Sequence, residues 1–232
     1  MEKIVAEERK LFYCDLGFID YKEAWDLQKK IFEARKANII PDALLLLEHN
    51  HVYTLGKTAS YSNLIWSKEF LEKNKISVYE IDRGGDITYH GPGQLVAYPI
   101  INLSDWKQDA HLYLRTLEEV AIKVCNDFGL NANRIEKLTG VWIKDRKICA
   151  VGIKISSWIT MHGIAFNVNT NLDLFNGIIP CGITDKAVTS LSKELGYEIE
   201  MSKFKEIYLS KFIEVFNYDF TKQIEIEFLL SL

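Results

Sequence analysis

The amino-acid sequence predicts an α+β fold in which a mixed, mostly antiparallel sheet is flanked by helices. Two stretches, about 21–40 and 109–128, carry apolar residues at the 3.6-residue spacing of amphipathic helices. Short apolar runs bounded by proline, glycine or polar turns, among them 43–47, 94–101 and 148–155, are typical of strands. The two long helices and the string of short strands together favour this fold class.

Local capping signals support each helix. Asp20 and Glu23 form a capping box, and a stripe of Ala24, Leu27, Ile31 and Ala34 follows it towards Pro41. The helix expected from Asp109 to Phe128 has a stripe of Leu114, Leu117, Ala121 and Val124, and Gly129 ends it. Ser67 can cap a short helix through Leu71. Ser202 can cap a last helix with Phe204, Tyr208, Phe212 and Val215 on one stripe.

The expected strands are placed by their neighbours. The run 43–47 follows a proline and is apolar throughout, so we expect a strand buried on both faces. Residues 76–81 lead into a glycine-rich loop, and 94–101 lead out of it. Val141 to Ile143 and 148–155 flank a polar turn at 144–146, which indicates a hairpin, and a further strand is expected at 163–168.

Composition narrows the class of protein. We see no linker, repeat or low-complexity tract, so one domain is expected over 1–232. A formal charge of −4 and a pI near 5.8 argue against nucleic acid or an anionic membrane surface as the main partner. The amino terminus is charged and lacks an apolar stretch, so a cytoplasmic location is expected. The four cysteines show no C-x-x-C pair, which favours reduced thiols.

The most informative stretch is the glycine-rich loop from Arg83 to Gln94, which holds four glycines, a proline and His90 between two apolar segments. Glycines let the main chain approach a ligand closely, while the arginine and the histidine add a charge and a titratable ring. The alternative is a connecting turn in which Arg83 pairs with a carboxylate such as Asp82 or Asp86. The sequence therefore indicates a ligand-binding loop.

Cys181 lies between Pro180 and Gly182, in a segment that suits a shaped turn holding a thiol at a cavity. Simple core packing is the alternative, and we assign it to Cys14, Cys125 and Cys149. A nucleophilic cysteine needs a nearby cation, which Lys147, His49, His90 or His162 could supply. Lys147 could equally be an exposed turn lysine.

His49 and His51, with Glu48, raise the question of a metal site. No third ligand stands at a diagnostic spacing, and a histidine at the end of a strand is commonly a hydrogen-bonded structural residue. We therefore expect no metal.

Six blocks, taken together, resemble the lipoyl(octanoyl) transferases. They are Glu48-His49 with Val52 to Gly56, Arg83 to Leu95, Gly140-Val141-Trp142, Lys147 to Gly152, Thr160 to Ala165, and Pro180 to Ile183 with Val188 to Leu191. The blocks stand in the family's order from about residue 43 to 196. Three positions depart from its usual pattern: Lys57, Cys149 and Phe166. The last two put the shape of an acyl pocket, and hence chain-length preference, in question.

The resemblance implies a fold like the catalytic domain of biotin and lipoate protein ligases, with its core at about 36–217. It also implies that Cys181 is the acyl-thioester nucleophile and that Lys147 lowers the thiol pKa and handles protons. The implied substrate contacts are Arg83, Gly84, Gly85, Asp86, Ile87, Thr88, Tyr89, His90, Ala150, Val151, Gly152, Gly163, Ile164 and Ala165. His49 and His162 are possible auxiliary residues.

The implied activity is transfer of an octanoyl group from octanoyl-acyl carrier protein to a lysine ε-amine. The expected acceptors are apo lipoyl domains of 2-oxoacid dehydrogenases and the glycine cleavage H protein. The enzyme would need no ATP, because the thioester donor is already activated. It would also need no metal, and it is expected to act as a monomer. The alternatives are an ATP-dependent lipoate or biotin ligase, a non-enzymatic acyl-binding module and a metal-dependent hydrolase.

Overall fold

The computed structural model describes residues 8–179 and 187–232. Its first half contains β1 Lys10–Phe18, α1 Tyr21–Lys36, β2 Asp42–Glu48, β3 Val52–Leu55, α2 Lys68–Lys73, β4 Ser77–Glu80, β5 Ile87–His90, β6 Gln94–Ile100 and α3 Ala110–Asp127. The second half contains β7 Asn133–Ile135, β8 Leu138–Ile143, β9 Arg146–Ser156, β10 Ile159–Asn167, β11 Ala187–Val188, α4 Leu191–Leu195, α5 Met201–Phe216, β12 Phe220–Gln223 and α6 Ile226–Ser231. Short 3₁₀ helices cover Tyr61–Asn63, Leu103–Asp105 and Leu172–Gly177.

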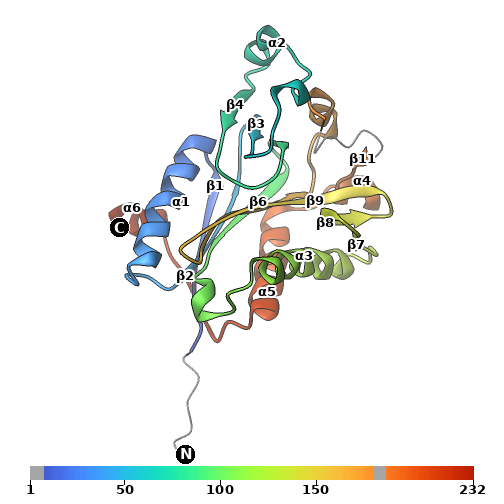
Figure 1. The fold of residues 1–232 in the computed structure, drawn as a ribbon. Helices are drawn as coiled ribbons and strands as arrows, with labels where there is room; N and C mark the ends of the chain where they lie inside the picture. Colours follow the sequence, from blue (N-terminus) through green and yellow to red (C-terminus); the bar gives the residue numbers. More distant parts are fainter. Residues whose placement is uncertain (1–7, 180–186) are drawn as a thin grey trace, which may run out of the picture.

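The described strands form two sheets. The larger one runs in the order β12-β1-β2-β6-β10-β9-β8-β7, and β11 also pairs with β9. Strand β1 is parallel to both neighbours, while every pairing from β2 through to β7 is antiparallel. The smaller sheet, β4-β3-β5, stands above the larger one with α2 at its tip (Figure 1). The predicted mixed, mostly antiparallel α+β architecture is confirmed.

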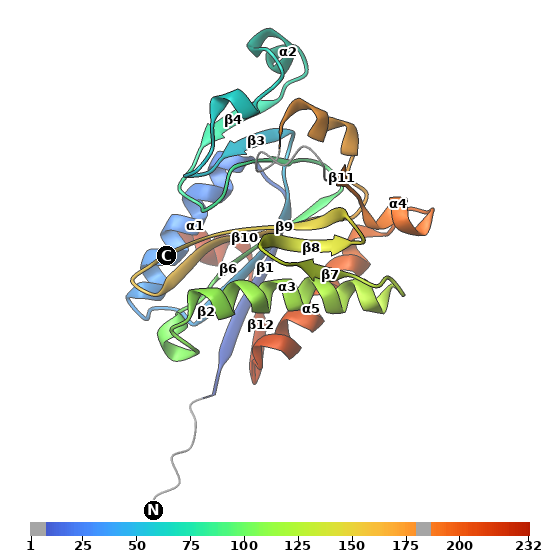
Figure 2. The ribbon, with the colours of Figure 1, turned by 45° about the vertical axis from the view of Figure 1, so that its right-hand side comes forward.

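Helices cover both faces of the larger sheet. Helix α1 packs on β6 and β10 on one face, whereas α3 and α5 lie side by side beneath the other (Figure 2). Strand β2 shows the consequence, because Leu44 and Leu46 join the core under α3 and α5 while Leu45 and Leu47 join the core under α1. The expected strand buried on both faces is confirmed.

Two of the three predicted N-caps are present. The side chains of Asp20 and Ser67 accept hydrogen bonds from backbone N–H groups of the first turns of α1 and α2, and Asp109, which was expected only as the start of its helix, does the same for α3. The Ser202 cap is wrong, because α5 begins at Met201 and Glu200 occupies the cap position, two residues earlier than predicted. The Ser202 hydroxyl instead hydrogen-bonds the Glu200 carboxylate at 2.5 Å. No described helix is both long and apolar enough to cross a membrane.

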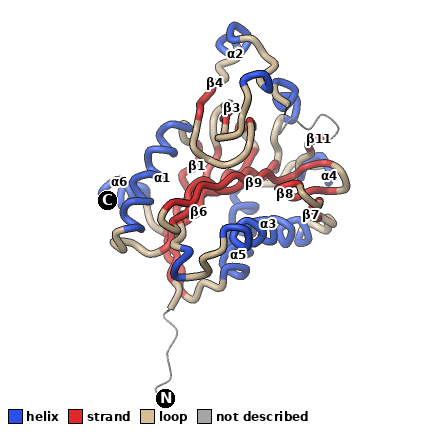
Figure 3. Tube along the Cα trace, viewed as in Figure 1, coloured by secondary structure: helices blue, strands red, loops and turns tan. Residues whose placement is uncertain are grey.

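The glycine loop connects the two sheets rather than two neighbouring strands (Figure 3). The strand leading into it, β4, belongs to the smaller sheet, and the strand leading out, β6, belongs to the larger one. Its residues Ile87–His90 form strand β5, which pairs antiparallel with β3. Neither β5 nor β1 was expected from the sequence. The loop is thereby held above the middle of the larger sheet.

Strand β10 is distorted where it passes beneath the glycine loop. His162 has a left-handed backbone with φ of 58°, and Gly163 beside it faces Gly152 of β9. A methyl group on Gly163 would lie 2.2 Å from the Ala97 carbonyl oxygen of β6. Only glycine therefore fits there without a shift of the backbone.

Gly163→Ala should lower the free energy of unfolding by about 1–3 kcal/mol, the usual cost of forcing an extra methyl into a packed site. Urea unfolding followed by circular dichroism measures it. An unchanged midpoint would show that β6 and β10 can separate freely at this position.

Candidate active site

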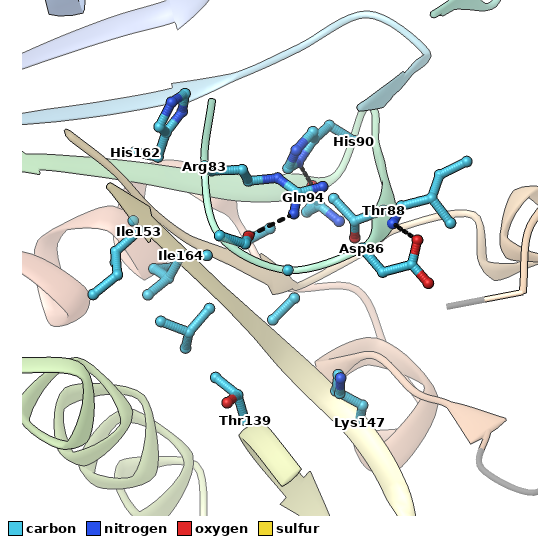
Figure 4. Close-up of a pocket in the computed structure, with 18 of the residues that line it drawn as sticks. Arg83, Asp86, Thr88, His90, Gln94, Thr139, Lys147, Ile153, His162 and Ile164 are labelled. Carbon is cyan, nitrogen blue, oxygen red and sulfur yellow. Dashed lines mark hydrogen bonds between the residues drawn. The ribbon is translucent and has the colours of Figure 1, made fainter. Parts of the chain in front are cut away.

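A cavity of about 530 Å³ lies between the glycine loop above and strands β8, β9 and β10 below (Figure 4). Most of the residues that the family resemblance assigned to substrate line it: Arg83, Gly84, Gly85, Asp86, Ile87, Thr88, His90, Ala150, Val151, Gly152, Gly163, Ile164 and Ala165. Lys147 and His162 also line it. Segments about 80 residues apart in the sequence thus surround one space.

Hydrogen bonds hold the start of the glycine loop over β9. The buried Arg83 guanidinium donates to the Thr54 carbonyl oxygen at 2.7 Å and to the Thr54 hydroxyl at 3.0 Å. The Gly84 N–H donates to the Ile153 carbonyl oxygen at 2.8 Å. The loop therefore bridges the smaller sheet and β9.

Both carboxylates suggested as partners of Arg83 have other contacts. The Asp86 carboxylate accepts from the Asn63 side-chain amide at 2.6 Å and from the Ile87 N–H at 2.7 Å. The Asn63 carbonyl oxygen accepts from the Ile179 N–H at 2.8 Å. Asp86 therefore ties the glycine loop to the described chain that immediately precedes residues 180–186.

Asp82 forms a second polar group with Lys154 and with His162, which lines the cavity. Its two oxygens lie 2.9 Å from the His162 Nε2 atom and 2.6 Å from the Lys154 ammonium. The hydrogen bond to His162, with that to Lys154, holds the pKa of Asp82 far below its usual range. Burial lowers the pKa of His162, although Asp82 opposes that shift. His162 and Lys147 lie on opposite sides of the cavity (Figure 4).

His90 is a neutral hydrogen-bond donor. Its Nδ1 atom lies 2.8 Å from the Gln94 Oε1 atom, while the Gln94 amide nitrogen donates to the Tyr89 carbonyl oxygen and the Asn167 side chain. Because that amide nitrogen is the donor in both bonds, Oε1 must accept from His90. Burial holds the pKa of His90 well below its usual range. This network joins the glycine loop to the end of β10.

Lys147 lies near the start of β9, next to strand β11. Its ammonium is 4.7 Å from the centroid of the Trp142 ring. Strand β11 pairs with Arg146 and Lys147, and the Thr189 N–H donates to the Lys147 carbonyl oxygen at 2.9 Å. Cys181 lies outside the described residues, so its contact with Lys147 stays a prediction.

Two of the assigned residues lie behind the cavity wall. The Tyr89 ring is buried against Tyr53 and Phe175, and its hydroxyl lies 2.8 Å from the His51 Nδ1 atom. The His49 ring is also buried, with Nδ1 2.9 Å from the Ile19 carbonyl oxygen and Nε2 2.9 Å from the Tyr98 hydroxyl. Neither ring lines the cavity.

The metal hypothesis for His49 and His51 finds no support in their contacts. Each ring makes a different hydrogen bond, one to Tyr98 and the other to Tyr89. Within residues 8–179 and 187–232, no group of three or more His, Cys, Asp or Glu side chains could hold a metal ion.

The two departures expected to reshape an acyl pocket do not line this cavity. Cys149 and Phe166 are fully buried in the core that α3 and α5 cover, and neither lines the cavity. They are paired residues on β9 and β10, at positions whose side chains point away from the glycine loop. The doubt about chain length that we attached to these two residues was therefore misplaced.

Several cavity residues were missed in the sequence. Tyr21, Gln94, Tyr98, Leu114, Thr139 and Asn167 all line the cavity. Leu114 was assigned only to the stripe of its helix, and Gln94 only to the end of the glycine loop. The expectation that a strand continues from Gln94 offered one usable signal, since polar residues at strand ends often face a site.

The buried state of His49 gives a pH-dependent stability. Burial lowers the pKa of His49 from 6.5 to about 4, so between these values the unfolded chain binds more protons than the folded one. Stability contributed by neutral His49 is complete above pH 6.5 and is lost as pH falls, by about 3 kcal/mol at pH 4.

His49→Gln should therefore flatten the fall in unfolding free energy between pH 7 and pH 4.5, a change that urea titrations at both pH values measure. His162 is common to both proteins and its contribution cancels, whereas the pKa of His90 is lowered by burial and by the neighbouring His49, so the measured difference in slope includes the response of His90. His111→Gln, at an exposed histidine, is the matched control. Equal slopes for wild type and His49→Gln would mean that His49 titrates normally in the fold.

Comparison with known proteins agrees with this geometry. The sequence-family model of the lipoyl protein ligase A/B catalytic domain matches residues 20–213 of the chain. Octanoyltransferases of Solibacter usitatus and Cytophaga hutchinsonii are each 46% identical to the chain; the alignments cover 88% and 87% of it and 92% and 91% of the relatives. An octanoyltransferase of Thermoanaerobacter sp. is also 46% identical, over 92% of this chain and 93% of the relative.

Solved structures show the same fold at low sequence identity. Lipoate-protein ligase A bound with ATP superposes with a TM-score of 0.75 at 17% identity, over 97% of this chain and 93% of the other. Biotin protein ligase from Aquifex aeolicus, in complex with biotin and ATP, gives 0.51 at 15% identity over 90% and 70%. The expected ligase-like fold is confirmed, and the sequence matches show that this chain belongs to the lipoyl protein ligase A/B catalytic-domain family, among its octanoyltransferases.

Proposed function

We propose that this acyltransferase moves an octanoyl group from octanoyl-acyl carrier protein to a lysine of an apo lipoyl domain, through a thioester on Cys181. The observation that carries the proposal is the single cavity that Lys147 shares with the glycine loop and the small residues of β9 and β10. These are the segments that the octanoyltransferase resemblance assigns to substrate and catalysis. They converge here from three separate parts of the chain.

In the first step the Cys181 thiolate attacks the thioester carbonyl carbon of the donor. A new carbon–sulfur bond forms and the bond to the carrier thiol breaks. The Lys147 ammonium gives its proton to the departing sulfur and becomes a neutral amine. The Trp142 ring, 4.7 Å from that ammonium, stabilises its charged form before transfer.

In the second step the neutral ε-amine of the acceptor lysine attacks the octanoyl-enzyme. A carbon–nitrogen bond forms and the bond to the Cys181 sulfur breaks, which returns the thiolate. The neutral Lys147 takes the proton that the acceptor amine loses. The thiolate and ammonium are thus restored together.

The walls of the cavity suit an aliphatic chain. Leu114, Leu138, Val151, Ile153 and Ile164 supply apolar surface from α3, β8, β9 and β10. Each methylene removed from water contributes about 0.8 kcal/mol, so an eight-carbon chain binds more tightly than a short one. This surface supports an acyl donor with a medium-length chain.

The proposed reaction uses neither nucleotide nor metal. The glycine loop lines the cavity with Asp86 and has no lysine, and its Arg83 is hydrogen-bonded to Thr54, which together disfavour a triphosphate there. The bound ATP in related solved structures belongs to those ligases. Transfer from a thioester already supplies the activation that ATP supplies in a ligase.

The proposed acceptors are the lipoyl domains of 2-oxoacid dehydrogenases and the glycine cleavage H protein. The proposed donor is the acyl carrier protein, and we propose the cytoplasm as the location of the reaction. The lining residues of the cavity all come from one chain, so we propose that the enzyme acts as a monomer.

Incubation with octanoyl-acyl carrier protein and an apo lipoyl domain, without nucleotide, should give an octanoyl adduct on the enzyme and then on the acceptor. Intact mass spectrometry of all three proteins follows both, and hydroxylamine should remove the adduct from the enzyme. Cys181→Ser and Lys147→Ala should each lower turnover at least about 1,000-fold with the fold intact.

Cys149→Ser is the matched cysteine control, and it should transfer at close to the wild-type rate. Near-normal transfer by Cys181→Ala would falsify the covalent route. An absolute need for ATP would instead favour the ligase reaction.

The four cysteines should differ sharply towards iodoacetamide at pH 7. Burial raises the pKa of Cys14 to about 11 and that of Cys125 to about 12, and it holds the pKa of Cys149 well above its usual range. These thiols are protonated and buried, so they should react only after unfolding. Peptide mapping of the native protein should find the label on Cys181, and equal labelling of Cys149 would reassign the nucleophile.

A further inference from the structure

We propose that Glu118 on α3 is a positioning residue that sets the location of the Lys147 ammonium by fixing the backbone of Gly140. The inference rests on the proposed function in so far as Lys147 takes part in acyl transfer. Glu118 itself does not line the cavity, and its connection to Lys147 runs through β8.

Glu118 is a buried carboxylate with a partner on each side. Its side chain is 0% exposed. Oε1 accepts from the Gly140 N–H at 2.9 Å, while Oε2 accepts from Arg115 at 2.7 Å and from Arg134 at 3.0 Å. Burial of an ionised carboxylate costs free energy unless hydrogen bonds and opposite charges compensate it, as these three partners do. The two arginines balance the charge and leave one oxygen for the backbone of β8.

Gly140 is the point at which β8 meets the stem of Lys147. Its φ is +119°, a conformation that L side chains rarely adopt, and an added methyl would lie 2.7 Å from the Cys149 carbonyl oxygen. The same methyl would lie 3.4 Å and 3.5 Å from the Cε and Cδ atoms of Lys147. The lysine stem therefore passes directly over the bare backbone that Glu118 holds.

The pairing of β8 with β9 is irregular at this point. Val141 pairs with Cys149 but Trp142 pairs with Lys147, so the register shifts between the two pairs. The shift places the buried Trp142 ring under the Lys147 ammonium, at 4.7 Å from the ring centroid to Nζ. The Lys147 stem passes over Gly140, and its ammonium lies over the Trp142 ring. The Glu118 hydrogen bond to the Gly140 N–H anchors the part of β8 that contains both residues.

A carboxylate is the only side chain that suits this position. Gly140 and the two arginines all donate hydrogen bonds, so the central group must accept on both sides. A glutamine would point its amide N–H groups at either the Gly140 N–H or the guanidinium groups. Glu118→Gln therefore breaks one side of the anchor while it keeps the size of the side chain.

The test compares Glu118→Gln with Glu119→Gln. Glu119 is the next residue on the helix and also contacts Arg134, at 2.8 Å, whereas the carboxylate that accepts from the Gly140 N–H is that of Glu118. We expect Glu118→Gln to lower the rate of octanoyl-enzyme formation at least about tenfold, with the KM for octanoyl-acyl carrier protein within about twofold. Glu119→Gln should stay within about twofold of wild type.

A double-mutant cycle separates positioning from general stability. In a Lys147→Ala background, Glu118→Gln should change the remaining rate by less than about twofold, because the residue that it positions is gone. An undiminished tenfold loss in that background overturns the inference, as does equal activity of Glu118→Gln and Glu119→Gln.

A substrate-free readout keeps the inference testable on its own. Competitive labelling of amines with acetic anhydride, followed by peptide mass spectrometry, should modify Lys147 at least about threefold faster in Glu118→Gln than in Glu119→Gln or wild type, since the anchored stem is released. Equal labelling overturns the inference. If Glu118→Gln does not fold, Arg115→Gln and Arg134→Gln, which loosen the same carboxylate from the surface side, take its place with the same expectations. A wild-type enzyme that forms no octanoyl adduct would contradict the proposed function. The labelling of Lys147 would still decide whether Glu118 positions it, because that measurement uses no substrate.

Discussion

The cavity depends on the pairing of small residues between β9 and β10. Gly152 faces Gly163 and Ala150 faces Ala165, so the floor beneath the glycine loop is largely free of side chains. A methyl on Gly152 would come within 3.0 Å of the Arg83 side chain and 3.3 Å of the Gly84 carbonyl oxygen. The loop therefore rests almost on the backbone of the sheet, and the space that remains can hold an extended ligand.

The polar groups around this floor carry little free charge. Burial keeps His49 and His90 neutral, and Asp82 faces His162 and Lys154. The Arg83 guanidinium donates two hydrogen bonds to Thr54, which anchors the loop to the smaller sheet. The proposed acyl thioester is neutral at its reacting end and apolar along its tail, which fits the apolar residues that line this cavity beside its charged ones.

Local sequence patterns were enough for the elements whose own residues decide them. The all-apolar run of β2 and the capped, periodic α1 and α3 were predicted because burial and spacing act within each segment. Strand β5 was missed, because Ile87–His90 becomes a strand only by pairing with β3, more than 30 residues earlier. The same limit applies to Tyr98 and Asn167, which enter the site through sheet register. It also explains the error over Cys149 and Phe166, whose burial depends on how α3 and α5 pack against β9 and β10.

A lysine that both gives and takes a proton needs a partner that stabilises its charge without locking it. The face of an aromatic ring does this, contributing about 0.5–2 kcal/mol to the ammonium form, whereas a buried carboxylate in direct contact would hold the proton far more firmly. The chain has such a carboxylate near by in Glu118, but Arg115 and Arg134 occupy one of its oxygens and the Gly140 backbone occupies the other. The Trp142 ring lies 4.7 Å from the Lys147 ammonium. In the proposed mechanism the protonation state of Lys147 changes twice in each turnover, and an aromatic neighbour at this position is compatible with both states.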